Sequence, residues 1–208
     1  MNYLASFKPL VAKALGRKAV LTFGIPPFVD GSCRREPDFE SRFPSISALC
    51  RFTKFAPRLQ VGDTVVYITH KGRYFQTKSH WRLVGILKVL ERFESHAAAA
   101  QWYKERSIPL PSNCIVSENP PLPLEKTIGA MDSIRRWDGI YQLRTRKCGV
   151  FLVCESKFVE LHNPPILGDE AMIDVFGRIP GTRNPGRISD AELAKLKSMM
   201  HIAIKESE

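Results

Sequence analysis

The sequence predicts a single α+β domain: a small, mixed, curved β-barrel flanked by helices, with a C-terminal helix. Three observations lead to this prediction. Residues 64–69 and 81–93 are apolar and β-branched, as core strands are. Serines at the starts of two other segments, Ser95 and Ser189, are typical helix N-caps. Apolar residues make up 44% of the 208 residues, which is enough for one hydrophobic core.

The first elements along the chain are predicted from short apolar segments that end at prolines. Residues 18–25 (KAVLTFGI) are short and rich in apolar and β-branched side chains, which predicts a buried strand. Residues 45–55 (SISALCRFTKF) carry apolar side chains at helical spacing. Ser45 is a suitable N-cap for that helix, and Pro57 would end it.

The middle of the chain predicts two consecutive strands. Gly62–Asp63 forms a turn into the strand at 64–69, with Asp63 accepting hydrogen bonds from backbone N–H groups of the turn. Residues 81–93 alternate between two faces that are both mostly apolar. A long strand of this kind with an internal glycine, Gly85, suits a barrel strand that bends there.

The following segments mix helix, extended chain and strand. Residues 95–106 predict a helix, and 109–123 hold five prolines, which predicts an extended connection. Residues 140–145 and 149–155 read as the two strands of a hairpin. Residues 158–161 predict a further short strand.

Residues 189–192 (SDAE) form a capping box, which predicts the start of a last helix. The spacing of its apolar residues predicts that this helix packs on the sheet as a lid. We therefore divide the chain into three parts. Residues 1–17 form an N-terminal basic segment, 18–162 the barrel domain, and 163–208 a C-terminal loop and helix packed on the same domain.

Composition argues against several classes of protein. The five cysteines are odd in number and lack CxxC spacing, so we expect free thiols, no zinc site and no other metal site. The longest apolar runs, 150–154 and 83–87, are far shorter than the roughly 20 residues that cross a bilayer. Residues 1–17 lack the apolar block of a signal peptide. We expect a cytoplasmic protein without a membrane partner and without a cofactor.

Charge is distributed unevenly along the chain. Residues 1–110 carry eighteen Lys and Arg against eight Asp and Glu, a net charge of +10, whereas residues 111–208 carry thirteen of each. Such a field concentrates polyanions on one region of a surface. The charge favours nucleic acid, with two alternatives left open: simple solvation of a basic surface, and an anionic membrane or small acidic ligand.

The middle of the chain also resembles a known group of domains. Residues 59–68 (LQVGDTVVYI) and 83–89 (LVGILKV) resemble the strand patterns of the PUA-like superfamily, particularly its EVE and ASCH branches and the nucleotide-modification-associated domains. The resemblance covers residues 19–93. It implies a small barrel whose pocket lies between the first strand's exit, the following helix and the Gly-Asp strand. In relatives this pocket is believed to hold an extruded, often modified base.

Base-pocket candidates are the side chains near those elements that could stack on or bind a base. They are Phe28, Phe43, Cys50, Tyr67, Thr69 and Trp81. Tyr67 and Trp81 are favoured because they flank the basic loop at 71–80, and their rings would meet if the two strands pair as a hairpin. The alternative for each aromatic ring is packing in the core.

Phosphate-binding candidates are the cations of the basic half of the chain: Arg34, Arg35, Arg51, Lys54, Lys71, Arg73, Lys78 and Arg82. Each such contact adds salt-dependent affinity for a nucleic acid. We assign no catalytic residue. Cys50 could in principle form a nucleophilic pair with a histidine, but we favour a buried, inert thiol.

These observations favour a nucleic-acid-binding module that recognises a base, whether ordinary, modified or flipped out, in a PUA-like pocket flanked by basic residues. Two alternatives remain: an enzyme that modifies or hydrolyses nucleotides or nucleic acid on the same fold, and a protein-interaction module. The choice between DNA and RNA and the oligomeric state stay open.

Overall fold

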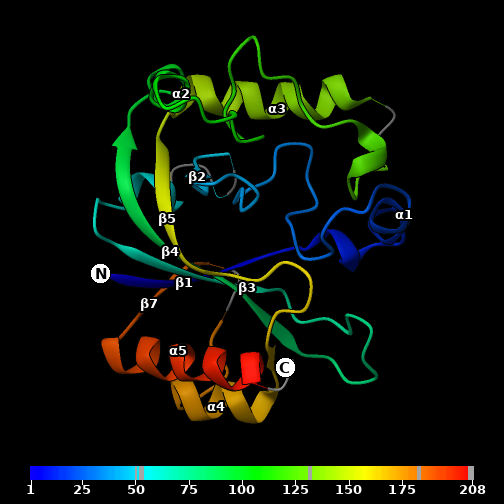
Figure 1. The fold of residues 1–208 in the computed structure, drawn as a ribbon, viewed down its shortest axis with the longest axis vertical. Helices are drawn as coiled ribbons and strands as arrows, with labels where there is room; N and C mark the ends of the chain where they lie inside the picture. Colours follow the sequence, from blue (N-terminus) through cyan, green and yellow to red (C-terminus); the bar gives the residue numbers. More distant parts are fainter. Residues whose placement is uncertain (50, 52–53, 131–132, 182–183, 206–208) are drawn as a thin grey trace.

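One mixed β-sheet forms the centre of the molecule, with helices on both sides of it (Figure 1). The computed structural model describes residues 1–49, 51, 54–130, 133–181 and 184–205. The strands are β1 (Asn2–Phe7), β2 (Ser45–Ser47), β3 (Thr64–Thr69), β4 (Trp81–Phe93), β5 (Phe151–Val159), β6 (Ile166–Leu167) and β7 (Gly186–Ile188). The α-helices are α1 (Ala14–Phe23), α2 (His96–Glu105), α3 (Ile134–Lys147), α4 (Asp169–Phe176) and α5 (Asp190–Lys205).

The strand order confirms the α+β class but does not show a closed barrel. The order is β2-β5-β4-β3-β1-β7, with β6 paired to β4 beside this path. Within the described residues this order is an open path, so the sheet is not closed into the barrel that the sequence predicted. Helices α2 and α3 lie on one side of the sheet, and α4 and α5 lie on the other (Figure 1).

The N-terminal strand β1 lies inside the sheet, between β3 and β7. It runs parallel to β3, with Asn2 opposite Thr64 and Phe7 opposite Thr69. Residues 2–7, which the sequence placed in a separate basic segment, therefore belong to the sheet. Because β1 and β3 are parallel and in register, both strands end at the same edge. The residues that follow them meet there.

Strands β3 and β4 have the predicted bounds. Gly62 has a φ of 90°, a conformation that favours glycine, and Asp63 Oδ2 accepts a hydrogen bond from the backbone N–H of Gln60 at 2.9 Å, as predicted for this turn. The pairing of β3 with β4 shifts after Tyr67, which lies opposite Gly85. A Cβ atom on Gly85 would lie 2.8 Å from the Phe39 ring. The absence of a side chain at Gly85 therefore leaves room for the Phe39 ring, which comes from the irregular segment before β2.

The predicted strand at 18–25 is wrong, because α1 covers most of it. Gly24, with a φ of 64°, caps the helix and donates a hydrogen bond to the Val20 carbonyl oxygen at 3.0 Å. Gly16 allows the helix to pass close to the Leu10 carbonyl group. The apolar run that suggested a buried strand is not buried throughout, since Leu21 is 87% exposed.

Two other predictions of secondary structure are wrong. The helix predicted at 45–55 is wrong, because this segment begins with strand β2. Ile46 of β2 pairs with Leu152 of β5. Hydrogen bonds to a strand so far along the chain cannot be predicted from local helix propensity. The predicted strand at 140–145 lies inside α3. The strand predicted at 149–155 is confirmed as β5 (Phe151–Val159). This strand also includes the first two residues of the separate short strand predicted at 158–161.

Two of the three predicted helix caps, Ser95 and Ser189, are confirmed, whereas Ser45 begins strand β2 and caps no helix. Ser95 Oγ accepts a hydrogen bond from the Ala98 N–H at 3.1 Å at the start of α2. At the start of α5, Ser189 Oγ accepts from the Glu192 N–H at 3.2 Å, and Glu192 Oε2 accepts from the Ser189 N–H at 2.6 Å. None of the helices in the described part of the chain combines the length and apolar content that spanning a bilayer requires.

Apolar side chains fill both sides of the sheet. The upper core, on the side of α2 and α3 in Figure 1, includes Phe7, Phe28, Phe39, Tyr67 and Leu87. The lower core, on the side of α4 and α5, includes Leu4, Val66, Ile68, Trp81, Ile86, Leu193 and Leu196. Because Leu193 and Leu196 belong to α5, the last helix packs on the sheet as the lid that its spacing predicted.

Candidate nucleic-acid interface

The aromatic base-pocket candidates are mostly core residues. Phe28 is buried in the upper core, and its ring faces Tyr74 edge to face at 5.8 Å. Phe43 packs edge to face on Trp102 at 5.3 Å. Thr69 is buried, and its Oγ1 accepts a hydrogen bond from the backbone N–H of Arg82 at 2.9 Å. The other polar candidate, Cys50, lies outside the described residues.

Tyr67 and Trp81 lie on opposite faces of the sheet. Tyr67 is 2% exposed and packs between Phe7 and Phe39 in the upper core. Trp81 is 4% exposed and belongs to the lower core. The expectation that the two rings meet across a hairpin is therefore wrong, because the register of β4 places Gly85, and not Trp81, opposite Tyr67.

Three of the eight phosphate-binding candidates are buried arginines that the protein itself binds. Arg82 donates to His80 Nε2 at 3.0 Å and to the Pro164 carbonyl oxygen at 2.7 Å. Arg35 pairs with Glu40 at 2.6 Å. Arg34 is 2% exposed. A buried guanidinium that is already hydrogen-bonded does not reach a phosphate in solvent, so the three arginines hold the fold together.

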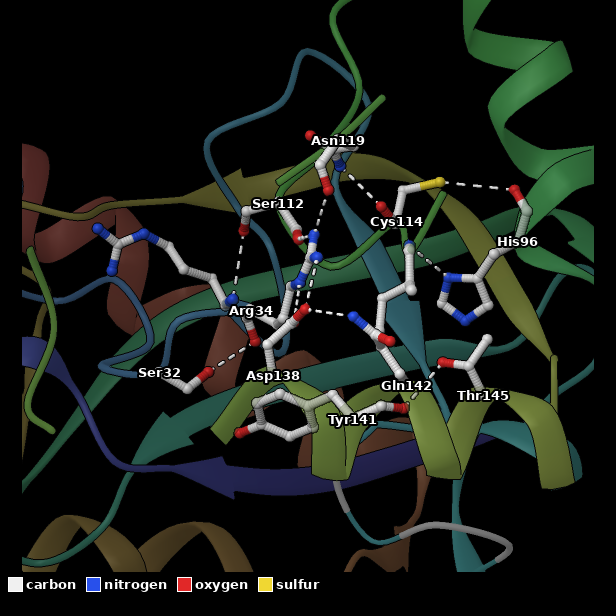
Figure 2. A network of polar contacts seen from close by, with 12 residues as sticks. Ser32, Arg34, His96, Ser112, Cys114, Asn119, Asp138, Tyr141, Gln142 and Thr145 are labelled. Atoms are coloured by element: carbon white, nitrogen blue, oxygen red, sulfur yellow. Dashed lines mark hydrogen bonds and ion pairs between the residues drawn. The ribbon is translucent and has the colours of Figure 1, made fainter. Parts of the chain in front are cut away.

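Arg34 is the centre of a polar network that packs against α3 (Figure 2). Its Nε donates to Asp138 Oδ1 at 2.6 Å and one terminal nitrogen donates to Asp138 Oδ2 at 3.2 Å. The other terminal nitrogen donates to the carbonyl oxygens of Ser112 and Asn119, at 3.2 and 2.8 Å. The guanidinium thus ties α3 and the proline-rich connection to the irregular segment 28–39.

Glu36 is the second unusual group in that segment, because it is a buried carboxyl group that makes no ion pair with any of the described residues. Its Oε1 accepts from the Ser47 N–H at 2.9 Å, and its Oε2 accepts from the Ser47 hydroxyl and from Asn113 Nδ2 at 3.1 Å. Burial raises the pKa of Glu36 from 4.5 to about 8 despite these hydrogen bonds. The raised pKa favours the protonated form of Glu36 at pH 7, and the side chain links Ser47 of β2 to Asn113 of the proline-rich connection.

Buried thiols do not supply a nucleophile in the described part of the chain. Burial raises the pKa of Cys33 and that of Cys114 to about 12, and raises that of Cys154 as well. Protonated thiols are poor nucleophiles and poor metal ligands. The described residues also contain no cluster of three His, Cys, Asp or Glu side chains that could hold a metal ion.

A cationic edge forms where the parallel strands β1 and β3 end. Lys8 follows β1, and His70 follows β3. Arg51 reaches this edge from another segment and donates a hydrogen bond to the Ser6 carbonyl oxygen at 2.5 Å. Desolvation lowers the pKa of His70, and the positive charges of Arg51 and Lys8 lower it further. Lys8, Arg51 and His70 therefore lie together at this edge of the sheet.

The loop that follows β3 extends this edge into solvent. Gly72 and His80 exchange two backbone hydrogen bonds, each 2.9 Å long, which close the loop at its base. Between them, Arg73 and Lys78 are exposed, and among the described residues neither makes an ion pair. We define the cationic edge as Lys8, Arg51, Lys54, His70, Lys71, Arg73 and Lys78. Lys54 is exposed and lies next to Arg51, since its backbone N–H donates to the Arg51 carbonyl oxygen at 2.8 Å. The other four predicted cations that are not buried, Arg51, Lys71, Arg73 and Lys78, also belong to the edge or its loop.

An open pocket of about 690 Å³ lies beside this loop. Its lining comes from the loop on one side and from the start of α4 on the other: Lys71, Gln76, Thr77, Lys78, Ser79, His80, Ile166, Gly168, Asp169 and Glu170. Lys71 spans the two sides, since its Nζ is 2.6 Å from Asp169 Oδ1 and 4.6 Å from the centre of the Trp81 ring. The Trp81 ring thus makes a cation–π contact with Lys71, a cation that lines the pocket.

Sequence reasoning found the loop but missed part of the edge. Lys8 escaped notice because the strand before it was not recognised, and only the parallel pairing of β1 with β3 brings it near His70. Residues 3–7 (YLASF) are mostly apolar and are followed by Lys8. The segment 64–69 is likewise followed by His70 and Lys71, and this similarity could have indicated a second strand that ends at a cation. Fold and edge together describe an α+β protein with a cationic edge beside an open pocket.

Comparisons with known proteins add one structural likeness. No family model and no curated protein matches the chain. Among solved structures, the chain is similar to the crystal structure of ASCH from Zymomonas mobilis, with 8% sequence identity and a TM-score of 0.40, over 95% of this chain and 94% of that chain. ASCH is one of the branches that the motif at 59–68 resembles. A likeness at this TM-score carries no information about ligand or activity.

Proposed function

We propose that the protein binds nucleic acid along the cationic edge and accommodates one base in the pocket beside the loop at 70–80. The observation that carries this proposal is the convergence of exposed cations from separate parts of the chain, with Arg51 and Lys8 close enough to lower the pKa of His70. A cluster of this kind attracts a polyanion, because each phosphate it neutralises releases condensed counterions.

The pocket supports base recognition as well as backbone binding. Its lining combines cations with neutral hydrogen-bonding groups, among them Gln76, Thr77 and Ser79. Amide and hydroxyl groups of this type can pair with the edges of an extruded base, while the flanking lysines contact the phosphates. His80 has a defined orientation there, because its Nδ1 lies 3.0 Å from the Lys78 carbonyl oxygen and its Nε2 accepts from Arg82.

Neutralising the loop tests the proposal. In the double variant Arg73→Gln/Lys78→Gln, we expect weaker binding of a fluorescently labelled single-stranded oligonucleotide. The plot of log affinity against log salt concentration should become shallower by about 1.4, at about 0.7 for each lost phosphate contact. Fluorescence anisotropy across a salt series measures both quantities.

The matched control neutralises two exposed cations of α3, in Arg146→Gln/Lys147→Gln. Both double variants have the same net charge, but α3 lies on the opposite side of the sheet from α4 (Figure 1), whose first residues line the pocket. The control should retain the affinity and salt slope of the unmodified protein. Equal losses in the two variants would mean that only net charge matters. A loss confined to the control would move the interface to α3. Either result overturns the proposal.

A further inference from the structure

One aromatic side chain stands out at the tip of the loop. Phe75 is 71% exposed, whereas the aromatic candidates Phe28, Tyr67 and Trp81 are buried. Its backbone φ is 67°, and that of Tyr74 is 32°. Two consecutive aromatic residues at positive φ are unfavourable, because the left-handed region crowds a Cβ atom against the backbone. The loop therefore keeps an uncommon conformation that turns Phe75 into solvent.

The loop holds this conformation by its anchor. Tyr74 is buried, and its hydroxyl donates a hydrogen bond to the His70 carbonyl oxygen at 2.6 Å. Its ring packs edge to face between Phe28, at 5.8 Å, and His80, at 5.7 Å. With Tyr74 pointing into the upper core and the loop closed at its base, the neighbouring Phe75 is directed outward from a fixed support. Less entropy is then lost when a ligand contacts the ring.

The surroundings of Phe75 are cationic and polar. Arg73 precedes it by two residues and Lys78 follows it by three, and residues 76–79 are all exposed and polar or charged. A lone ring among such residues buries little apolar area in a bilayer, which argues against a membrane anchor. A flat ring beside two cations instead matches a nucleotide, whose base stacks while its phosphate pairs with a cation.

We propose that Phe75 is a stacking platform for an unpaired base of a single-stranded nucleic acid. This inference rests on the proposed function and deepens it by naming the conformation of the partner. In a duplex the faces of the bases are covered by their neighbours, so the ring has no partner there. In a single strand any base can lie on the ring, while Arg73 and Lys78 hold the flanking phosphates.

Three substitutions at Phe75 separate stacking from other contacts. The probes are labelled single strands of about 15 nucleotides, as DNA and as RNA, and a blunt DNA duplex of the same sequence. We expect Phe75→Ala to weaken single-strand binding about tenfold. Phe75→Leu should lose as much, because it keeps apolar area without a flat face, and Phe75→Trp should keep the affinity. Duplex binding should be the same in all three variants.

Thermal unfolding is measured on the same proteins, and no variant should melt earlier, since the Phe75 side chain is 71% exposed. The inference is overturned if Phe75→Leu binds single strands like the unmodified protein, or if Phe75→Ala binds them unchanged. It is also overturned if the unmodified protein binds vesicles of phosphatidylserine and phosphatidylcholine and Phe75→Ala does not.

These failures are distinguishable from failure of the proposed function. If Phe75→Ala has no effect while Arg73→Gln/Lys78→Gln still weakens binding and flattens the salt slope, the cationic edge binds nucleic acid without stacking on Phe75. If neither variant changes binding, both the proposed function and the stacking platform are wrong.

Discussion

Two pairs of neighbouring cations in this protein have opposite fates. Arg34 and Arg35 lie in the irregular segment beneath α3 and are buried, each paired with a carboxylate. Arg73 and Lys78 lie in the closed loop after β3 and are exposed. In the sequence the two pairs look alike, and both were predicted to contact phosphate. The difference lies in their partners, since Asp138, which binds Arg34, is 104 residues away along the chain.

The comparison shows that local positive charge does not by itself indicate a binding surface. A buried arginine loses its hydrogen bonds to water and must replace them with bonds to a carboxylate and to carbonyl oxygens. These bonds occupy the same N–H donors that a phosphate would use. An exposed cation keeps its donors for a ligand but adds little to stability. The same substitution should therefore affect stability at one pair and binding at the other.

The largest effect is expected from Arg34→Ala. Removing the guanidinium leaves Asp138 as an uncompensated buried charge and leaves two carbonyl oxygens without their donor, which costs about 3–5 kcal/mol of unfolding free energy. Arg73→Ala is the matched control and should change that free energy by less than about 0.5 kcal/mol. Urea denaturation measures both variants. Similar losses in the two would mean that the buried network contributes nothing special.

A smaller effect is expected where the irregular segment touches the sheet. Gly85→Val should cost about 1–3 kcal/mol, because its Cβ atom would lie 2.8 Å from the Phe39 ring and the core has no room to yield. Gly186→Val in strand β7 is the control, since a Cβ atom there meets nothing within 4 Å. If the two variants have the same midpoint of denaturation, the Phe39 ring can move away from residue 85 at little cost. The irregular segment that carries Phe39 is then packed less tightly than its burial indicates.

The smallest effect concerns Glu36 and pH. The pKa of this carboxyl group is raised to about 8, so between pH 6.5 and 8 the folded state keeps a proton that the unfolded state has lost. Stability contributed by this group is fully present below pH 4.5, and it is lost as pH rises toward 8. One bound proton corresponds to a fall of at most about 1.4 kcal/mol per pH unit.

The pH window avoids the opposite contribution of His96. Burial lowers the pKa of His96 from 6.5 to about 4, so its stability contribution is lost only as pH falls below 6.5. Above pH 6.5 the decline should therefore come mainly from Glu36. Glu36→Gln keeps a side chain that can bond Ser47 and Asn113 but does not titrate, and its unfolding free energy should decline less over this window. An equal decline in both proteins would assign the pH dependence to other groups.

Elements whose stability is local were predictable from the sequence. Strands β3 and β4 have the predicted bounds because a turn residue starts one and alternating apolar residues define the other. The two serine caps also lie where local hydrogen bonding requires them. The predictions for residues 18–25 and 45–55 were wrong, because over a short segment the spacing of apolar residues fits both a strand (period 2) and a helix (period 3.6). For residues 45–47, pairing with β5, which lies about 100 residues later in the chain, determines the outcome.

The candidate site was predicted only where it depends on a contiguous loop. The loop with Lys71, Arg73 and Lys78 is recognisable from its charge alone. Burial of the aromatic candidates could not be foreseen, because a strand residue faces a core or a pocket according to what covers it. Phe75 was passed over among the aromatic residues, since nothing in the sequence shows that Tyr74 enters the core and turns its neighbour outward.

The position of β1 within the sheet has a consequence for how the chain folds. This strand pairs with β3 on one side and with β7, more than 180 residues later, on the other. Contacts between such distant segments close large loops, which slows folding and leaves intermediates in which part of the sheet is unfinished. Until β7 docks, β1 is the edge strand of an apolar sheet, and residues 2–4 present an open row of backbone donors and acceptors. An unfinished edge of this kind is where chains of this protein would pair with one another and aggregate.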